Sequence, residues 1–348
     1  MRSLAAAVVA LLCVVLLVRG AAGADPDYAS PGRFTVRQVD ETWTDAARDR
    51  DIPLRIRLPE NRAPEGSGRV PVIVFSHGLG GSRDGGREWG EHWASRGFAV
   101  IHVQHPGSDE ALWKDKPPGE RFSGLRGGAS LQQFLARIAD IKFVVADLDR
   151  RQSAGDPLAA RLNLDRLGMS GHSFGAITTL FLGGQRPAPG IADRLAAGLP
   201  EKRFTAFLAF SPQALGADPE HQFSAFGRPA LLITGTLDGR PFPGLGATVE
   251  QRLVPFASMP ATGNKYFLVI DQADHMYFNG TRGLRDMGIG GRESIDFATV
   301  EARGYALTKA ISTAYWLAYL RDDGTALGWL KSGDAASLAA ADARLEMK

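Results

Sequence analysis

The sequence predicts an α/β fold in which a mostly parallel central sheet is flanked by helices on both faces. Nearly continuous apolar runs, such as residues 70–78 and 98–107, end at glycine, as strands buried on both faces do. Other segments, such as residues 130–151, repeat apolar side chains at helical spacing. Strands that alternate with helices form parallel sheets. Binding or reactive groups are then expected just after the strands, at their carboxyl ends.

The expected elements follow one another along the chain. We expect strands at residues 34–45, 52–60, 70–78, 98–107, 164–171, 204–212, 229–236 and 265–272. We expect helices at residues 87–97, 130–151, 173–184, 247–259 and 300–322. Ser130 is a candidate N-cap of the second of these helices. Residues 107–128 are rich in glycine, proline and charge, and are predicted to form a long surface loop.

The N-terminus has the pattern of a secretory signal peptide. Arg2 precedes an apolar run over residues 4–18, and the segment ends in small residues at Ala22-Gly23-Ala24. The run is short for a membrane-spanning helix, although an uncleaved N-terminal anchor is the alternative. We therefore expect an exported chain, periplasmic or secreted, without stable membrane insertion after cleavage. The expected boundaries are a signal peptide at 1–24, a linker at 25–33 and a single domain at 34–348.

The charge and cysteine content narrow the function classes. The chain has 40 Lys and Arg residues and 38 Asp and Glu residues, and the signal peptide holds two of the basic residues and none of the acidic ones. The mature chain is therefore balanced in charge, which gives no basis for binding nucleic acid or an anionic membrane surface. The one cysteine, Cys13, lies in the signal peptide. The mature chain thus has no disulfide and no thiol nucleophile.

A serine lies between two glycines, after a predicted strand and before a predicted helix, in Gly171-His172-Ser173-Phe174-Gly175. A strand–turn–helix context is what the nucleophile elbow of serine hydrolases requires. The glycines permit a tight turn, and the serine then projects at a helix N-terminus, where negative charge is favoured. The alternative is a serine N-cap in a glycine-rich turn. We interpret Ser173 as a nucleophile.

A serine hydroxyl needs a base, and the base needs an acid. His275 follows the last predicted strand, and Asp238 follows the strand before it. The chain order Ser173, Asp238, His275 is the order expected for nucleophile, acid and base in such a sheet. The alternatives are a loop histidine bonded to the backbone and a turn aspartate before glycine. Among the other histidines, we expect His77 to support a turn and His172 to point away from the serine.

The glycine-rich segment Ser76–Ser82 follows the apolar run 70–75 of another predicted strand and is a candidate oxyanion hole. Its glycines let the backbone approach a substrate closely. We assign the backbone N–H groups of Leu79 and Phe174 to the hole. A phosphate-binding loop is excluded because no Gly-Lys-Ser/Thr follows. We expect no cofactor, and no histidine, aspartate or glutamate residues have the spacing of a metal site.

At this point the sequence resembles the α/β-hydrolase superfamily over residues 34–332. The motifs HGLGGS, GHSFGA and ADHMYF are similar to those of the serine branch of the dienelactone hydrolases, and through it to platelet-activating-factor acetylhydrolases and cutinase-type polyester hydrolases. The resemblance implies the triad Ser173, Asp238 and His275. The acetylhydrolases place their acid after the strand that follows the elbow, where this chain has Ser211. The phospholipid substrate is therefore not carried over.

These observations predict hydrolysis of small-molecule or polymeric carboxylic esters, of short to medium acyl length, through an acyl-enzyme. The loop over residues 105–128, which contains Trp113 and Phe122, either borders the acyl pocket or is a solvated connection. An exported serine peptidase is one alternative, because the same triad cleaves amides. A non-catalytic binding protein on the same fold is the other. The sequence carries no signal of oligomeric state.

Overall fold

A computed structural model describes residues 26–60, 68–187, 197–240, 244, 246–281 and 297–348 of the chain. The predicted signal peptide lies outside the described residues. Residues 26–33, the described part of the expected linker 25–33, lie against the body of the protein. Tyr28 is buried there and packs edge-on against Trp329.

In the described part of the chain, nine strands form one sheet in the order β1-β2-β4-β3-β5-β6-β7-β8-β9. The strands are β1 Val36–Asp45, β2 Arg50–Pro59, β3 Val70–Ser76, β4 Ala99–Val103, β5 Leu162–His172, β6 Phe204–Phe210, β7 Ala230–Leu237, β8 Lys265–Asp274 and β9 Ala343–Met347. The strands β4, β3, β5, β6, β7 and β8 pair in parallel, and β1, β2 and β9 add antiparallel edges.

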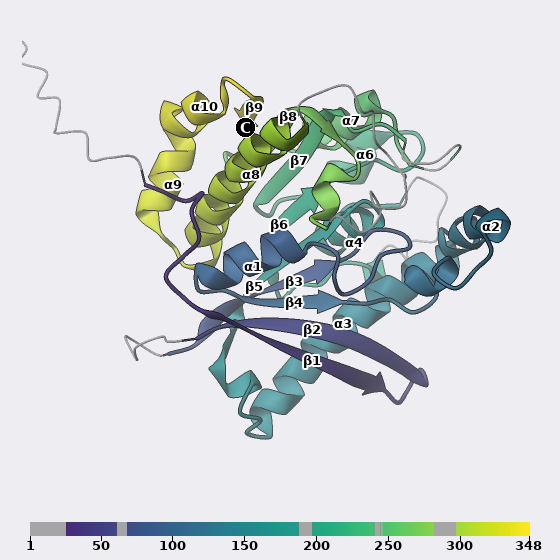
Figure 1. Ribbon diagram of the computed structural model, residues 1–348. Helices are drawn as coiled ribbons and strands as arrows, with labels where there is room; N and C mark the ends of the chain where they lie inside the picture. The colour runs from purple at the N-terminus through teal and green to yellow at the C-terminus, as the bar shows by residue number, and fades with distance from the viewer. Residues whose placement is uncertain (1–25, 61–67, 188–196, 241–243, 245, 282–296) are drawn as a thin grey trace, which may run out of the picture.

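Helices cover both faces of this sheet (Figure 1). They are α1 Arg87–Ser95, α2 Pro118–Gly128, α3 Leu131–Ser153, α4 Phe174–Gly183, α6 Pro219–Phe223, α7 Val249–Ser258, α8 Phe297–Leu320, α9 Gly324–Lys331 and α10 Gly333–Ala339. Short 3₁₀ turns are η1 Glu110–Leu112, η2 Ala159–Arg161 and η3 Tyr277–Asn279. Every predicted strand and helix is found, with shifts of a few residues at the ends. No helix among the described residues is long and apolar enough to cross a membrane.

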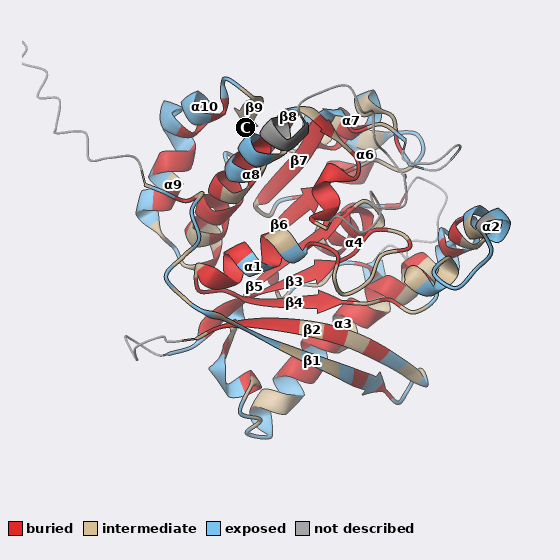
Figure 2. Cartoon of the chain, in the orientation of Figure 1, coloured by how far each residue is buried: buried red, intermediate tan, exposed pale blue. Residues whose placement is uncertain are grey.

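The core has two layers, one on each side of the sheet. One layer packs β-strand side chains against α3, α4 and α7, and the other packs them against α1, α8 and α9. The central strands are buried along most of their length, as Figure 2 shows in red. This burial explains the apolar runs of the sequence, because a strand covered on both faces has no solvent-facing side chains.

The loop predicted at residues 107–128 is only partly a loop. It contains η1 and the helix α2, which lies at the carboxyl-end side of the sheet in Figure 1. Glycines disfavour a helix, but two of them in α2 allow close packing against η1. A Cβ on Gly124 would lie 2.2 Å from the Leu112 carbonyl oxygen, and one on Gly128 would lie 2.2 Å from Leu112 Cδ1. Tertiary contact therefore overrides the local preference.

Candidate active site

The predicted site residues gather at the carboxyl ends of the parallel strands. Ser173 directly follows β5, Asp238 follows β7, and His275 follows β8. The candidate oxyanion loop follows β3, which is the neighbour of β5 in the sheet. Parallel strands end at a common edge, so residues far apart in sequence meet there.

Ser173 sits in a strained turn between β5 and α4. Its backbone has φ 57° and ψ −112°, in the positive-φ region that non-glycine residues rarely adopt. The flanking glycines are required by the packing. A Cβ on Gly175 would lie 1.9 Å from the Ser76 carbonyl oxygen, and one on Gly171 would lie 2.5 Å from the Gly175 carbonyl oxygen. The elbow therefore brings α4 against β3 at a distance that only glycine allows.

Ser173, His275 and Asp238 form one chain of hydrogen bonds. The Ser173 hydroxyl lies 2.9 Å from His275 Nε2, and His275 Nδ1 lies 2.7 Å from Asp238 Oδ1. The Thr234 hydroxyl donates to the other carboxylate oxygen, Oδ2, at 2.7 Å. Asp238 and His275 are buried, whereas Ser173 is half-buried. With Nδ1–H donating to Asp238, Nε2 is free to accept the serine proton.

Charge and burial set the protonation states of this pair. Burial alone would raise the pKa of Asp238, but the positive charge of Arg252 and the contact with His275 hold that pKa well below its usual range. Burial lowers the pKa of His275, Asp238 opposes this effect, and Arg252 adds to it. Asp238 is therefore ionised and His275 neutral at neutral pH, which are the states that an acid–base relay needs.

His172 contacts His275, a contact that the sequence does not predict. Its Nε2–H donates to the carbonyl oxygen of His275 at 3.0 Å, and its ring centroid lies 4.7 Å from that of His275. Burial lowers the pKa of His172 well below its usual value, so the ring is neutral. His172 therefore bonds to the backbone of His275 and ties the residue just after β8 to the end of β5.

The candidate oxyanion loop lies beside the elbow. A Cβ on Gly78 would lie 3.5 Å from the Ser173 Cβ. Phe174 is the first residue of α4, so its N–H has no acceptor within the helix. His77 holds the loop, as predicted for a turn-supporting residue: its Nε2 accepts from the His105 N–H at 3.1 Å, so its Nδ1–H donates to the Gly78 carbonyl oxygen at 2.6 Å.

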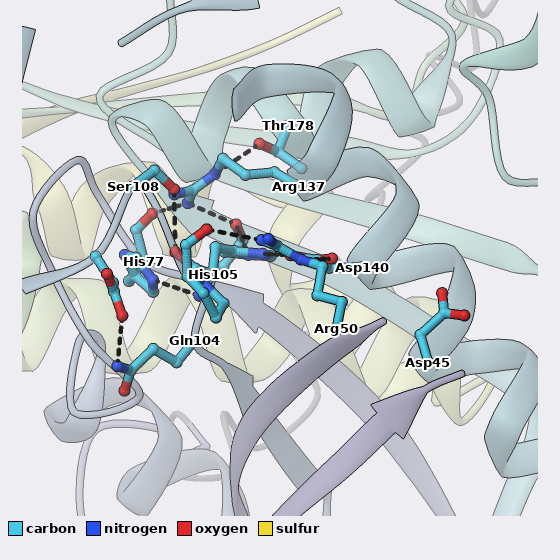
Figure 3. A network of polar contacts seen from close by, with 12 residues as sticks. Asp45, Arg50, His77, Gln104, His105, Ser108, Arg137, Asp140 and Thr178 are labelled. Atoms are coloured by element: carbon cyan, nitrogen blue, oxygen red, sulfur yellow. Dashed lines mark hydrogen bonds and ion pairs between the residues drawn. The ribbon is translucent and has the colours of Figure 1, made fainter. Parts of the chain in front are cut away.

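A buried arginine contacts the start of this loop at His77 (Figure 3). Arg137 of α3 donates to the hydroxyls of Ser76 and Ser108 at 2.9 and 2.8 Å, and to the His77 carbonyl oxygen. Its guanidinium carbon also lies 4.7 Å from the centre of the Phe174 ring. One cation thus contacts both walls of the candidate hole, the loop after β3 and the start of α4.

The network continues from Ser76 to a buried carboxylate. The Ser76 hydroxyl lies 3.0 Å from His105 Nε2, and His105 Nδ1 lies 3.0 Å from Asp140 Oδ2. Arg48 and Arg50 pair with Asp140 at 2.8 Å each. Burial would raise the pKa of Asp140, but His105 and Arg50 hold it at about 2. Burial lowers the pKa of His105 to about 4, so His105 is neutral and donates to the carboxylate.

The segment over residues 105–128 packs on the candidate oxyanion loop. The indole N–H of Trp113 donates to the Gly80 carbonyl oxygen at 2.7 Å. A Cβ on Gly80 would lie 2.5 Å from Leu125 Cδ2, so α2 and the loop are in close contact. Phe122 of α2 is exposed. The sequence left two interpretations of this segment, a border of the acyl pocket or a solvated connection. These contacts favour the first, because they place the segment against the candidate oxyanion loop.

Within the described ranges, no three or more histidine, cysteine, aspartate or glutamate residues lie close enough together to hold a metal ion.

Comparison with known families adds one match. Residues 53–114 match the family model of platelet-activating factor acetylhydrolase, isoform II. The matched segment contains β3, the candidate oxyanion loop, α1 and β4, and it ends before Ser173. A search among curated proteins found no match. The family match confirms the resemblance to platelet-activating-factor acetylhydrolases over this segment and supports a hydrolase of the α/β-hydrolase type.

Proposed function

We propose that this chain has the α/β-hydrolase fold and is a serine esterase that hydrolyses carboxylic esters through an acyl-enzyme. The observation that carries the proposal is the hydrogen-bonded relay from the Ser173 hydroxyl to His275 Nε2 and from His275 Nδ1 to Asp238, at 2.9 and 2.7 Å. The relay lies at a strained elbow, and such geometry is typical of an activated nucleophile.

The reaction follows from these positions. His275 Nε2 takes the hydroxyl proton as Ser173 Oγ attacks the ester carbonyl carbon. The tetrahedral intermediate collapses, the bond to the alkoxy oxygen breaks, and the imidazolium gives its proton to the leaving alcohol. A water molecule then attacks the acyl-enzyme with His275 as base. Collapse of the second intermediate releases the acid and returns the proton to Ser173. Asp238 stabilises the imidazolium in both halves.

We assign the backbone N–H groups of Leu79 and Phe174 to the oxyanion hole. Supporting this assignment are the closeness of Gly78 to Ser173 and the free N–H at the start of α4. A helix N-terminus also favours the developing negative charge. The two donors come from different strand ends, so the spacing between them depends on the contacts that Arg137 makes with both walls.

We propose a short to medium acyl group. The contacts of Trp113 and Leu125 with Gly80 place bulky side chains against the oxyanion loop, which limits the room on that side. The matching family is named for an acetylhydrolase, which removes a two-carbon acyl group. Both small-molecule and polymeric esters carry such groups. We further propose that residues 1–24 direct export and are removed.

The test is hydrolysis of nitrophenyl esters of increasing acyl length by the mature chain. We expect turnover of short esters, and a loss of about a thousandfold or more in Ser173→Ala, because the nucleophile is removed. Ser224→Ala is the matched control, since Ser224 is exposed and bonds only locally, to the His221 carbonyl oxygen. Substantial turnover in Ser173→Ala would overturn the proposal.

A fluorophosphonate probe separates the remaining alternatives. Labelling of the parent chain and of Ser224→Ala, but not of Ser173→Ala, is expected for an active serine hydrolase. If the labelled chain cleaves peptide amides and no ester, the exported peptidase is correct. If the parent chain is not labelled, a binding protein on the same fold is correct.

A further inference from the structure

A second buried arginine, Arg252, lies against the acid–base pair. It belongs to α7, and its side chain is 1% exposed. Its Nε lies 3.3 Å from Asp238 Oδ1, and its Nη2 lies 3.1 Å from His275 Nδ1. The residue therefore touches both members of the pair from the side opposite to Ser173.

Arg252 is held in place by carbonyl oxygens as well as by the carboxylate. Its Nη1 donates to the Ser211 carbonyl oxygen at 2.8 Å and to Gln213 Oε1 at 3.1 Å. Both acceptors come from the segment after β6, where the related acetylhydrolases are expected to place their acid. The guanidinium is thus fixed in a site from which water is excluded, and its charge is little screened.

The charge of Asp238 is consequently shared between two partners. Asp238 Oδ1 faces His275 Nδ1 at 2.7 Å and the Arg252 guanidinium at 3.3 Å. When His275 is neutral, the site holds one negative and one positive charge. When His275 is protonated, two cations share one carboxylate. An arginine has no acceptor atoms, so it offers nothing to an imidazolium.

The other groups around His275 leave Arg252 as its nearest fixed cation among the described residues. His172 of β5 lies ring to ring with His275 and is itself neutral because of burial. Asp274, the last residue of β8, accepts from the Tyr277 N–H and attracts the imidazolium weakly. Ser173 is uncharged. The balance at His275 is therefore set by Asp238 against Arg252.

We infer that Arg252 is a positioning residue that keeps Asp238 ionised and disfavours protonation of His275, so that the base stays available in mildly acidic solution. This inference rests on the proposed function for its role in catalysis, but the electrostatic effect on His275 exists whether or not the chain hydrolyses esters. The side chain acts through Asp238 and His275 and is not placed to touch a substrate.

The test is the pH profile of kcat/KM for a short nitrophenyl ester, between about pH 4 and pH 9, in the parent chain and in Arg252→Met. The acid limb reports the pKa of the base in the free enzyme. A charge within about 4–6 Å moves a pKa by about one to three units. We expect the acid limb of the Arg252→Met profile to shift to higher pH by about one pH unit or more. At the alkaline plateau, kcat/KM should stay within about tenfold of the parent.

Two further variants separate charge from packing. Arg252→Lys keeps the charge, so its acid limb should stay near that of the parent. Lys331→Met removes one positive charge at an exposed position of α9 and should leave the profile unchanged. If Arg252→Met does not fold, Arg252→Gln replaces it, since Gln removes the charge and keeps an N–H donor for the Ser211 carbonyl; the same upward shift is expected.

A titration without turnover keeps the two hypotheses distinct. The pKa of His275 is followed by NMR in histidine-labelled Ser173→Ala, with and without Arg252→Met, and the resonance is assigned by its loss in His275→Gln. A rise in pKa without Arg252 supports the inference even if no ester is turned over. A folded Arg252→Met or Arg252→Gln whose His275 titrates as in the parent overturns it.

Discussion

Replacing Arg137 with methionine tests how the two walls of the proposed oxyanion hole are held together. The guanidinium is fully buried and donates to Ser76, Ser108 and the His77 carbonyl oxygen. Methionine fills much of the same space but leaves these three acceptors, and the Thr178 hydroxyl at 3.4 Å, without their donor. A buried acceptor left without its hydrogen-bond donor costs about 1–3 kcal/mol of folding free energy. We expect a loss of this size in Arg137→Met.

The same change should lower kcat more than it changes KM. Without Arg137, the His77 carbonyl and the Phe174 ring lose the cation that both contact, so the loop after β3 can shift relative to α4. Loss of one oxyanion donor costs about a hundredfold to a thousandfold in kcat. We therefore expect a fall of about a hundredfold in kcat for a short nitrophenyl ester, with KM within about threefold.

The assays are urea unfolding followed by tryptophan fluorescence and steady-state kinetics under conditions where the variant is folded. Arg150→Met is the matched control: Arg150 lies on the same helix, but its side chain is 68% exposed and pairs with Asp147. Such a surface pair is worth at most about 1 kcal/mol. A folded Arg137→Met with kcat within about threefold of the parent would refute the role of Arg137 in positioning the hole.

Two further predictions concern the frame around the site. Asp140 has a pKa of about 2 in the folded chain against 3.8 ordinarily, so its ionised form contributes about 2 kcal/mol of stability above about pH 4, which is lost as pH falls toward about 2. In urea unfolding, the parent should therefore have a clearly larger free energy of unfolding than Asp140→Asn at neutral pH, and the difference should become smaller in acid. A difference that does not change with pH would contradict the stabilising role of ionised Asp140. Gly175→Ala would bring a Cβ to 1.9 Å from the Ser76 carbonyl oxygen, so we expect a loss of about 3 kcal/mol or more in the same assay. An alanine variant as stable as the parent would contradict the close approach of α4 to β3.

The predictions that the structure matches best are those that depend on local sequence. Ser173, Asp238 and His275 each follow an apolar strand, and the topology of a parallel sheet brings such strand ends together. The strands themselves were recognisable because burial on both faces leaves a continuous apolar run. The hydrogen bonds that join Ser173, His275 and Asp238 follow from this meeting of strand ends.

The features that sequence reasoning missed depend on contacts between distant segments. Arg137 and Arg252 are ordinary arginines in amphipathic helices, and only the fold shows that they face hydroxyls and carbonyls from other strand ends. The helix α2 was missed because its glycines disfavour a helix locally. The strand β9 was missed because it obtains its place from antiparallel pairing with β8 at the sheet edge.

The two buried arginines lie where the proposed reaction develops opposite charges. Arg137 contacts both walls of the proposed oxyanion hole, near the site of negative charge. Arg252 lies beside His275, where positive charge develops. Arg137 should favour the tetrahedral intermediate. Arg252 disfavours the imidazolium, so it lowers the rate somewhat at alkaline pH but keeps the base neutral in acid. Removing Arg137 should therefore lower the rate at every pH, and removing Arg252 should change mainly the pH at which the rate begins to fall.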